Sequence, residues 1–274
     1  MYWVDLAWPW GLSLISFCTY LYAKELAEND GGDITIKAYI ICVFYFLHGA
    51  RMGMGSLYML CSGTWSTKED LKRYQFQKIR TEAFGGTWNR LIMVKEIYAQ
   101  MVANSGLLFL PAVLVATDKS GVVHPLEMFG FGMWVFGWVI ESYADTHKLA
   151  FDLQNSKLVQ DEKKPFCDYG LWYYSRHPNY FGEWVAWSGL AISAIIPLSN
   201  LAINENAYGV PVEFVRGGLY FCLTMVCLSL YYCLSEWTGA IPAEHFSRMK
   251  RVGYNEYCET TSMLIPWFKK GKVA

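Results

Sequence analysis

Six runs of predominantly apolar residues constrain this chain more than any other feature; they are of roughly helix-spanning length, and the first and fourth are the shortest. The hydrocarbon core of a bilayer is about 30 Å thick, so a helix needs about 20 mostly apolar residues to cross it. The polar stretches between these runs and after the last one hold most of the charge. We therefore expect an all-α, polytopic membrane helix bundle that forms a single integral membrane domain over residues 1–274. The six expected spans are Trp8–Ala23, Ala38–Leu60, Glu96–Ala116, Glu127–Tyr143, Tyr180–Leu198 and Phe214–Leu234.

The distribution of Lys and Arg predicts which way the spans run, because loops on the cytosolic side of a membrane are enriched in both. Residues 61–95 hold seven of these cations, residues 144–179 hold five, and residues 235–274 hold six. The other connections hold only Lys24, Lys37 and Lys119, with Arg216 at the edge of the sixth span. Both termini and the two long loops are therefore expected on the cytosolic or matrix-equivalent side of the endoplasmic reticulum or another organelle membrane.

Charge and cysteine content exclude several classes of protein. The formal net charge is −1, so no bulk electrostatic field favours a nucleic-acid partner. The eight cysteines include no CxxC pair, and most lie inside apolar runs, where a thiol behaves as a small hydrophobe. The N-terminus lacks the basic region and cleavage site of a signal peptide, so the first helix is expected to be retained.

Polar residues inside the expected spans are candidates for a functional site, because charge in a bilayer is costly and usually faces a cavity or partner. The second span holds His48 and Arg51, for which the alternative is snorkelling of Arg51 to the interface. The third span holds Glu96, Gln100 and Asn104 at helical spacing, which is also typical of hydrogen bonding between helices.

A second group of polar residues follows the fourth span. Glu141, Asp145, Lys148, Asp152 and Asn155 share one helix face, which a solvated surface helix would also show. It is followed by the segment Gly170–Trp184, which contains Arg176, His177, Pro178, Asn179 and Glu183.

Pro178 suits the first turn of a helix. The free amides of that turn, beside Arg176 and His177, are typical of an anion or phosphate site. Asn179 and Glu183 lie one turn apart, where they could hold an amide, a ribose hydroxyl or Arg176. A purely structural role is the alternative.

The C-terminal segment is expected to form a folded, partly amphipathic cap on the cytosolic face. It contains Glu236, Glu244, His245, Arg248, Lys250, Arg251, Tyr254 and Tyr257, then Trp267 and Phe268 as interfacial anchors. Its Tyr and Arg side chains could close over a cofactor or contact lipid headgroups. The five histidines form no HxxH or HxxxH pair, so we expect no metal site.

The motifs of this chain resemble those of the steroid 5-alpha-reductase C-terminal superfamily, and within it the DUF1295 branch. The most specific is Ser175–Arg176–His177–Pro178–Asn179–Tyr180–Phe181–Gly182–Glu183. In order along the chain, the other matching elements are Val4–Pro9, Glu69–Tyr74 with Arg80, Glu141–Asp145 with Lys148, Gly253–Tyr257, and Ile265–Phe268. The likeness therefore runs nearly from end to end.

The resemblance implies a helical membrane fold with a cytosolic NADPH site and hydride transfer to a conjugated double bond of a lipid, steroid or isoprenoid. Residues carried over as cofactor ligands are Asp145, Lys148, Arg176, His177, Asn179, Glu183, Tyr254 and Tyr257. The resemblance implies that residues of the early helices polarise the substrate carbonyl, and Asp5, His48 and Arg51 occupy the corresponding positions. Expected partners are that lipid, membrane lipids and other subunits of a membrane complex.

Two departures from the family pattern bear on catalysis. The chain begins almost at the Val4–Pro9 element, whereas the family has another span before it, and loss of that span would open one wall of the substrate cavity. His48 occupies the station of a catalytic Tyr; a histidine can donate a proton. Cofactor binding could therefore survive without lipid reduction.

Two alternatives to the reductase stay open at this point. One is a structural or accessory subunit that retains the reductase fold. The other is an S-adenosylmethionine-dependent methyltransferase, because isoprenylcysteine carboxyl methyltransferases are similar in an RHP-x-Y element and a Glu…Tyr-x-x-Tyr tail.

Overall fold

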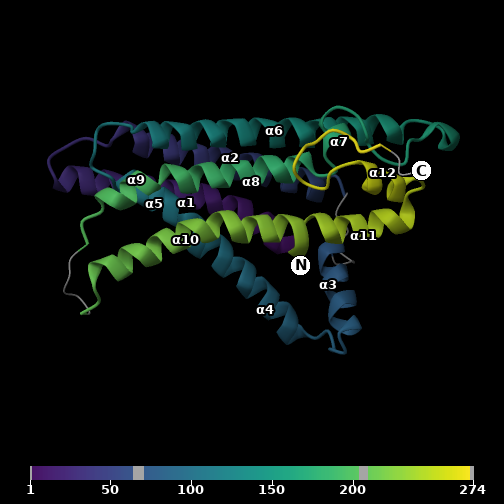
Figure 1. Cartoon of the computed structure of the whole chain (residues 1–274), viewed down its shortest axis with the longest axis horizontal. Helices are drawn as coiled ribbons and strands as arrows, with labels where there is room; N and C mark the ends of the chain where they lie inside the picture. Colours follow the sequence, from purple (N-terminus) through teal and green to yellow (C-terminus); the bar gives the residue numbers. More distant parts are fainter. Residues whose placement is uncertain (1, 64–70, 204–208, 272–274) are drawn as a thin grey trace. The chain divides into compact units, whose positions relative to one another are not determined.

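The computed structural model describes residues 2–63, 71–203 and 209–271, without the side chains of residues 2, 3, 100 and 103–105. The secondary structure of these residues is helical, apart from one isolated parallel bridge between Ser175 and Ser262 (Figure 1). The chain divides into two compact units. Unit 1 comprises Met1–Trp134 and Trp187–Ser229, and unit 2 comprises Val135–Ala186 and Leu230–Ala274.

Unit 1 contains the first long helices and the segments that connect them. Its helices are α1 (Tyr2–Asn29), α2 (Ile36–Cys61), α3 (Lys72–Ala83), α4 (Arg90–Met101), the π-helix η1 (Val102–Leu107), α5 (Leu108–Thr117), the start of α6 (Pro125–Ser156), the end of α8 (Pro178–Ser193), α9 (Ile195–Asn200) and most of α10 (Val212–Tyr232). Local chemistry sets several of these boundaries. The Thr35 hydroxyl accepts a hydrogen bond from the Ala38 amide at the start of α2. Asn89 caps α4 in the same way through the amides of Leu91 and Ile92.

Unit 2 contains the rest of α6, most of α8 and the C-terminal helices. Its other elements are the 3₁₀ turn η2 (Gln160–Glu162), α7 (Leu171–Tyr174), the π-helix η3 (Cys233–Trp237), α11 (Ala240–Lys250) and α12 (Tyr254–Thr260). Pro178 begins α8, as its position in the sequence predicts. Gly253 precedes α12 with φ of 78°, a left-handed conformation that favours glycine.

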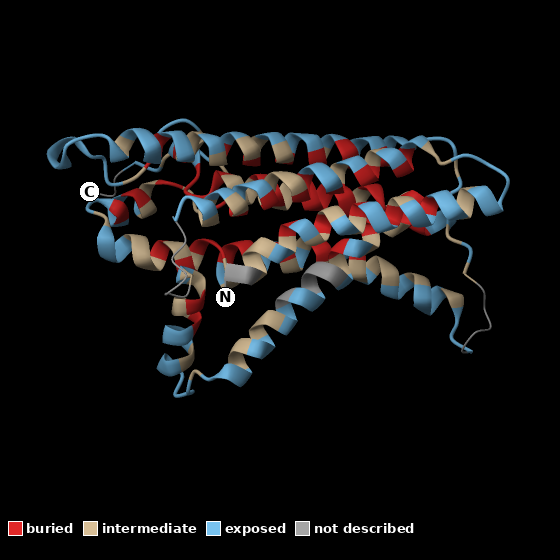
Figure 2. Cartoon of the chain, turned by 180° about the vertical axis from the view of Figure 1, so that it is seen from behind, coloured by how far each residue is buried: buried red, intermediate tan, exposed pale blue. Residues whose placement is uncertain are grey.

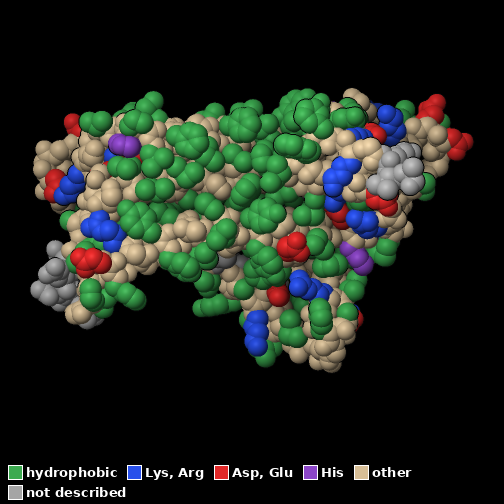
Figure 3. All heavy atoms as spheres, viewed as in Figure 1, with side chains coloured by type: hydrophobic (Ala, Val, Ile, Leu, Met, Phe, Trp, Pro, Cys, Tyr) green, Lys and Arg blue, Asp and Glu red, His purple; other side chains and the backbone are tan. Residues whose placement is uncertain are grey.

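Within the described residues, three helical segments are long and apolar enough to cross a membrane. They are Ile36–Cys61, Pro178–Asn200 and Val212–Lys250. Exposed apolar side chains, including Phe17, Phe46 and Phe221, lie along the long helices, and such surfaces suit contact with lipid (Figures 2 and 3). These properties are those of an integral membrane protein. Each of the six expected spans lies on helical residues, although η1 interrupts the third, the break between α8 and α9 interrupts the fifth, and the sixth ends in η3.

Glycines allow close helix packing within each unit. In unit 1, a Cβ at Gly49 of α2 would lie 2.5 Å from the Pro9 carbonyl oxygen of α1. In unit 2, a Cβ at Gly137 of α6 would lie 2.5 Å from the Ala186 amide nitrogen of α8. Small residues that let two backbones approach in this way are typical of helix interfaces in membranes.

A buried ion network joins several elements of unit 1 near the start of α2. Lys37 is fully buried, and its Nζ lies 2.5 Å from Asp118 Oδ2 and 3.4 Å from Glu127 Oε1. The other Glu127 oxygen accepts a hydrogen bond from the His124 amide, and Asn200 donates to Asp118. The network therefore anchors the start of α2 to the α5–α6 connection and to the end of α9.

Candidate functional site

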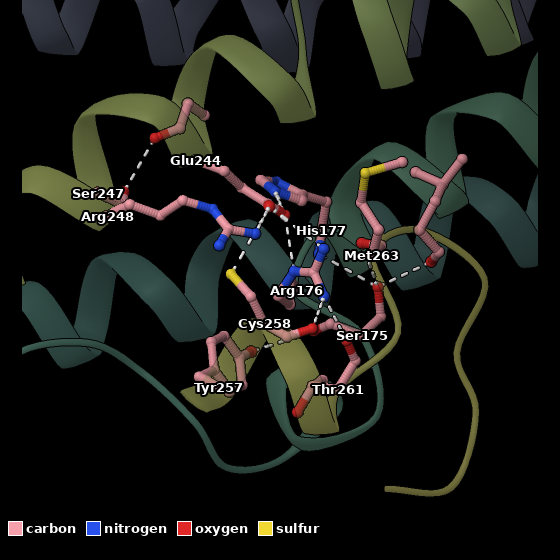
Figure 4. A network of polar contacts seen from close by, with 12 residues as sticks. Ser175, Arg176, His177, Glu244, Ser247, Arg248, Tyr257, Cys258, Thr261 and Met263 are labelled. Atoms are coloured by element: carbon pink, nitrogen blue, oxygen red, sulfur yellow. Dashed lines mark hydrogen bonds and ion pairs between the residues drawn. The ribbon is translucent and has the colours of Figure 1, made fainter. Parts of the chain in front are cut away.

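The RHP segment of unit 2 is tied to the C-terminal segment by its backbone. The Arg176 amide donates to the Ser262 carbonyl at 2.8 Å, and the His177 amide donates to the Met263 carbonyl at 3.1 Å. The Ser175 hydroxyl lies 2.7 Å from the Leu264 carbonyl oxygen, and the Trp267 amide donates to the Tyr174 carbonyl. Residues 174–177 and 262–267 therefore form one local structure, although they lie far apart in the sequence (Figure 4).

The Arg176 guanidinium lies at the centre of this structure and is only 9% exposed. Nε donates to Glu244 Oε1 at 2.7 Å and Nη2 donates to Glu244 Oε2 at 3.2 Å. Nη1 donates to the carbonyl oxygens of Cys258 and Thr261. Four of the five N–H groups of Arg176 are therefore engaged by α11, α12 and the residue after α12. We call this set, with His177, the Arg176–Glu244 network (Figure 4).

His177 shares the same carboxylate, since its Nε2 lies 3.1 Å from Glu244 Oε1. Burial lowers the pKa of His177, and the hydrogen bond and charge of Glu244 only partly oppose that effect. Its ring also stacks on Tyr180 with a centroid separation of 5.1 Å. At neutral pH His177 is therefore a neutral member of the network.

A second polar group on unit 2 lies where α6 faces the start of α8. Asn179 Nδ2 donates to Asp145 Oδ1 at 3.0 Å, which fixes the orientation of the amide. Asn179 Oδ1 is buried and, among the described residues, has no hydrogen-bond partner. Lys148 lies one turn of α6 beyond Asp145, with its ammonium 4.9 Å from the Trp172 ring centroid. We call these three residues the Asp145–Lys148–Asn179 niche.

The charge of Lys148 is incompletely compensated in this niche. Burial is the main cause that lowers its pKa, and Arg251 lowers it further, whereas Asp152 and Asp145 raise it. An anionic group bound here would favour the charged form of the Lys148 ammonium and would offset part of the unfavourable effect of its burial. The niche therefore combines a cation with a buried hydrogen-bond acceptor.

The remaining cofactor candidates are all buried in unit 2. The Tyr257 hydroxyl donates to the Trp172 carbonyl oxygen, and its ring stacks on Phe166. Burial raises the pKa of Tyr254 to about 12. Glu183 lies one turn after Asn179 on α8 and is also buried. The two tyrosines are therefore neutral phenols that pack against the segment before the RHP motif.

The three residues expected at the substrate lie in unit 1. Asp5, on the first turn of α1, pairs with Arg73 of α3. His48 is buried on α2 between Trp134 and Trp187, with its ring centroid 5.1 Å from that of Trp187. Arg51 lies one turn further along α2 and is partly exposed. Glu69 and Asp70 of the family motif, and the side chains of Gln100 and Asn104, lie outside the described part of the chain.

Sequence patterns assigned no specific role to two residues that pair with candidate site residues. Glu244 binds Arg176, and Arg73 binds Asp5. Glu244 stands in the polar C-terminal segment, where its spacing to Arg248 is typical of an ordinary surface pair. Its burial against Arg176, His177 and α12 sets it apart, and only the three-dimensional structure reveals that. In the described part of the chain, no group of three or more His, Cys, Asp and Glu is suited to hold a metal ion. The expectation of no metal stays a prediction.

Comparison with known protein families places the chain in one of them. Residues 1–261 match the sequence profile of a family described as Protein of unknown function (DUF1295). The chain belongs to this family. DUF1295 membership confirms the branch indicated by the RHP motif and supports a steroid 5-alpha-reductase-like membrane protein. No curated protein and no solved structure matches the chain.

Proposed function

We propose that this chain is an NADPH-dependent membrane reductase that reduces a conjugated double bond in a lipid, steroid or isoprenoid. In this proposal it crosses the membrane six times, with both termini and the two long loops on the cytosolic or matrix-equivalent side. Helices at all six expected positions support the span count. The alternation of basic and non-basic connections supports the orientation.

The observation that carries the proposal is the unpartnered Oδ1 of Asn179. A buried acceptor left without a donor costs about 1–3 kcal/mol, so such atoms usually have a partner in the functional state. Asp145 holds the amide with Oδ1 directed away from itself, so Oδ1 can accept a hydrogen bond. A nicotinamide carboxamide or a ribose hydroxyl offers such a donor.

The cationic part of the niche favours a cofactor that carries phosphate. Lys148 is the candidate for binding phosphate, with Arg251 adding positive charge close by. S-adenosylmethionine carries no phosphate, so it would offer no phosphate group to the charges of Lys148 and Arg251. When bound, NADPH would supply the hydride. The residues of the niche would bind and orient the cofactor, and Trp172, Tyr254 and Tyr257 would exclude water from the surroundings of the niche.

Arg176 has a different role in this proposal from the one its motif implies. Four of its N–H groups are engaged within the protein, so Arg176 and His177 support the niche by attaching the C-terminal segment to the start of α8. The same observation favours a second candidate, an accessory membrane subunit that keeps this fold. In that case the motif acts only through its structural contacts.

The test is thermal unfolding of the purified, detergent-solubilised protein with NADPH, NADH or S-adenosylmethionine. A ligand at a hundred times its Kd stabilises the native state by about 2.7 kcal/mol, which corresponds to about 5–11 °C in Tm for a chain of this size. We expect a shift with NADPH and a smaller or absent shift with the other two.

Lys148→Met tests the phosphate contact, with Lys164→Met as a matched control. Both lysines lie over an aromatic ring of unit 2, but only Lys148 belongs to the niche. We expect Lys148→Met to weaken NADPH binding roughly ten- to hundredfold, because it removes a charge-assisted contact. A shift with S-adenosylmethionine alone would favour the methyltransferase, and no shift with any ligand would favour the accessory subunit.

A further inference from the structure

The segment after α12 presents large apolar side chains on the surface of unit 2, beside α7. Trp267 and Phe268 are 68% and 75% exposed, and Ile265 is exposed as well. Tyr173 and Tyr174 of α7 are also exposed, and the Tyr174 ring centroid lies 6.2 Å from that of Phe268. We call these five residues the C-terminal apolar surface.

The backbone beneath this surface is held at two points. The Trp267 amide donates to the Tyr174 carbonyl at 2.9 Å, and the Lys270 amide donates to the Thr260 carbonyl at 2.9 Å. Leu264, just before the exposed residues, is buried and anchors the segment from the other side. The apolar side chains are therefore presented by an attached backbone and not by a frayed end of the chain.

The attachment to Tyr174 places the surface near the end of a membrane-spanning segment. Tyr174 precedes Pro178 by four residues, and Pro178 begins the segment Pro178–Asn200, which is long and apolar enough to cross a membrane. Four residues reach at most about 14 Å, so the surface lies close to the point where this segment enters the bilayer (Figure 1). Trp and Tyr side chains are enriched at that depth in membrane proteins.

Two lysines border the surface and supply positive charge. Lys269 Nζ lies 4.3 Å from the ring centroid of Tyr173, a contact that keeps the ammonium beside the surface. Lys270 follows it and is exposed. Neither lysine forms an ion pair with a residue that the structure describes. Residues 265–274 contain a third lysine and no acidic residue.

An anionic phospholipid matches both parts of this arrangement. Its phosphate or carboxylate oxygens can bind the two ammonium groups, and the base of its acyl chains can contact the aromatic rings. Clusters of Lys next to a membrane-spanning helix are attracted to anionic lipid in this way. A lipid is favoured over a partner protein because the bilayer already adjoins the start of α8.

We propose that the C-terminal apolar surface, with Lys269 and Lys270, docks on the membrane and binds the headgroup of an anionic phospholipid. Trp267 and Phe268 insert beside the headgroup, and the two ammonium groups bind its oxygens. Residues 262–267 carry the acceptors of the RHP amides, so the docked segment holds that motif at the membrane surface. The inference goes beyond the proposed function, because it holds for a reductase and for an accessory subunit alike.

The experiment titrates the detergent-solubilised full chain with short-chain phosphatidylglycerol or short-chain phosphatidylcholine and measures Kd by thermophoresis. Glycerol phosphate, which carries an anion without acyl chains, is tested as a competitor. The Tm of the chain is compared between nanodiscs of phosphatidylcholine alone and nanodiscs of phosphatidylcholine with phosphatidylglycerol.

A double variant, Lys269→Met with Lys270→Met, removes the two charges. Lys163→Met with Lys164→Met is the matched control, because these adjacent lysines of unit 2 are exposed and Lys164 also lies over a tyrosine ring.

The apolar contact is tested separately. Phe268→Ser removes one inserted ring, and Phe84→Ser is the control at another exposed phenylalanine.

We expect the native chain to bind phosphatidylglycerol more tightly than phosphatidylcholine, with little competition by glycerol phosphate. The Lys269 and Lys270 double variant should bind phosphatidylglycerol roughly thirtyfold more weakly, and added salt should reduce the preference of the native chain. Phe268→Ser should weaken binding of both lipids roughly three- to tenfold. Anionic nanodiscs should raise the Tm of the native chain but not that of the double lysine variant, because only a bound ligand stabilises the native state.

Several results would overturn the proposal. Equal affinity for the two lipids, or a Lys269 and Lys270 variant that binds like its lysine control, would show that these charges select no headgroup. Competition by glycerol phosphate as strong as that by the lipid would indicate a site for a soluble anion. A Phe268→Ser variant that binds normally but melts lower in phosphatidylcholine would reveal packing within the protein. Absence of saturable binding by either lipid would leave the surface to a partner protein.

Discussion

Changing Glu244 to Gln tests whether the Arg176–Glu244 network stabilises unit 2. The substitution keeps the shape of the side chain but removes the charge opposite Arg176, which is 9% exposed and hydrogen-bonded to both carboxylate oxygens. Removing one partner of a buried ion pair costs about 3–5 kcal/mol, because the other charge stays buried without compensation. For a chain of this size, that loss corresponds to a fall in Tm of about 6–20 °C.

Arg248→Ala provides a matched control on the same helix. Arg248 lies 3.5 Å from the same carboxylate, but its side chain is 45% exposed. Because the Arg248 side chain is largely hydrated, its i,i+4 contact is expected to contribute only about 0.3–0.5 kcal/mol, so the expected fall in Tm is about 1–2 °C. Thermal unfolding of the detergent-solubilised variants, followed by tryptophan fluorescence, measures both effects.

A double variant, Arg176→Met with Glu244→Leu, completes the test. Replacing both members of a buried ion pair with apolar residues is often close to neutral. Recovery should be incomplete here, because the carbonyl oxygens of Cys258 and Thr261 lose the donors on Arg176. If Glu244→Gln melts within the range of Arg248→Ala, or if the double variant is less stable than Glu244→Gln, this account of the network is wrong.

Three further predictions address packing, buried charge and pH. Gly137→Ala should lower Tm by about 2–12 °C, since the added Cβ meets the α8 backbone and overpacking costs about 1–3 kcal/mol; Gly132→Ala, where a Cβ meets open space, should not. Lys37→Met should lower Tm by about 6–20 °C, because Asp118 and Glu127 stay buried without their cation. The control Lys24→Met, which removes the exposed ion pair of Lys24 with Glu28, should change Tm little. His177 binds protons more weakly in the folded than in the unfolded chain, so stability should fall as the pH drops below about 6.5. Unfolding temperatures measured between pH 8 and pH 5.5 should show a smaller loss in His177→Gln; an equal loss would mean that other groups set the pH dependence.

The sequence predicted the helices well, because their signal is local. The apolar run of the second expected span, Ala38–Leu60, lies within the observed helix Ile36–Cys61, and Pro178 begins α8 as its chemistry requires. The family resemblance singled out both Asn179 and Asp145, but nothing in the sequence predicted that the two residues pair with one another.

The environment of Arg176 could not be predicted in this way. The pattern beside a helix start is typical of a phosphate site, but Arg176 is bound by Glu244, which lies 68 residues away along the chain. Asp5 is a similar case, because its partner Arg73 lies on α3, in a motif with no spacing relation to α1. Periodicity reports which face a residue occupies, whereas these pairings depend on how distant segments pack.

The backbone ties between residues 174–177 and 262–267 have a consequence for biosynthesis. The first segment leaves the ribosome well before the second, and the Ser175 hydroxyl and the Leu264 carbonyl that it contacts are 89 residues apart. During that interval the amides of Arg176 and His177 lack their final acceptors, and the guanidinium lacks the carbonyl groups of Cys258 and Thr261. Unit 2 therefore completes its folding only after translation of its last helix, so a premature stop before residue 262 would leave the RHP segment without its acceptors and expose it to the quality-control machinery of the membrane.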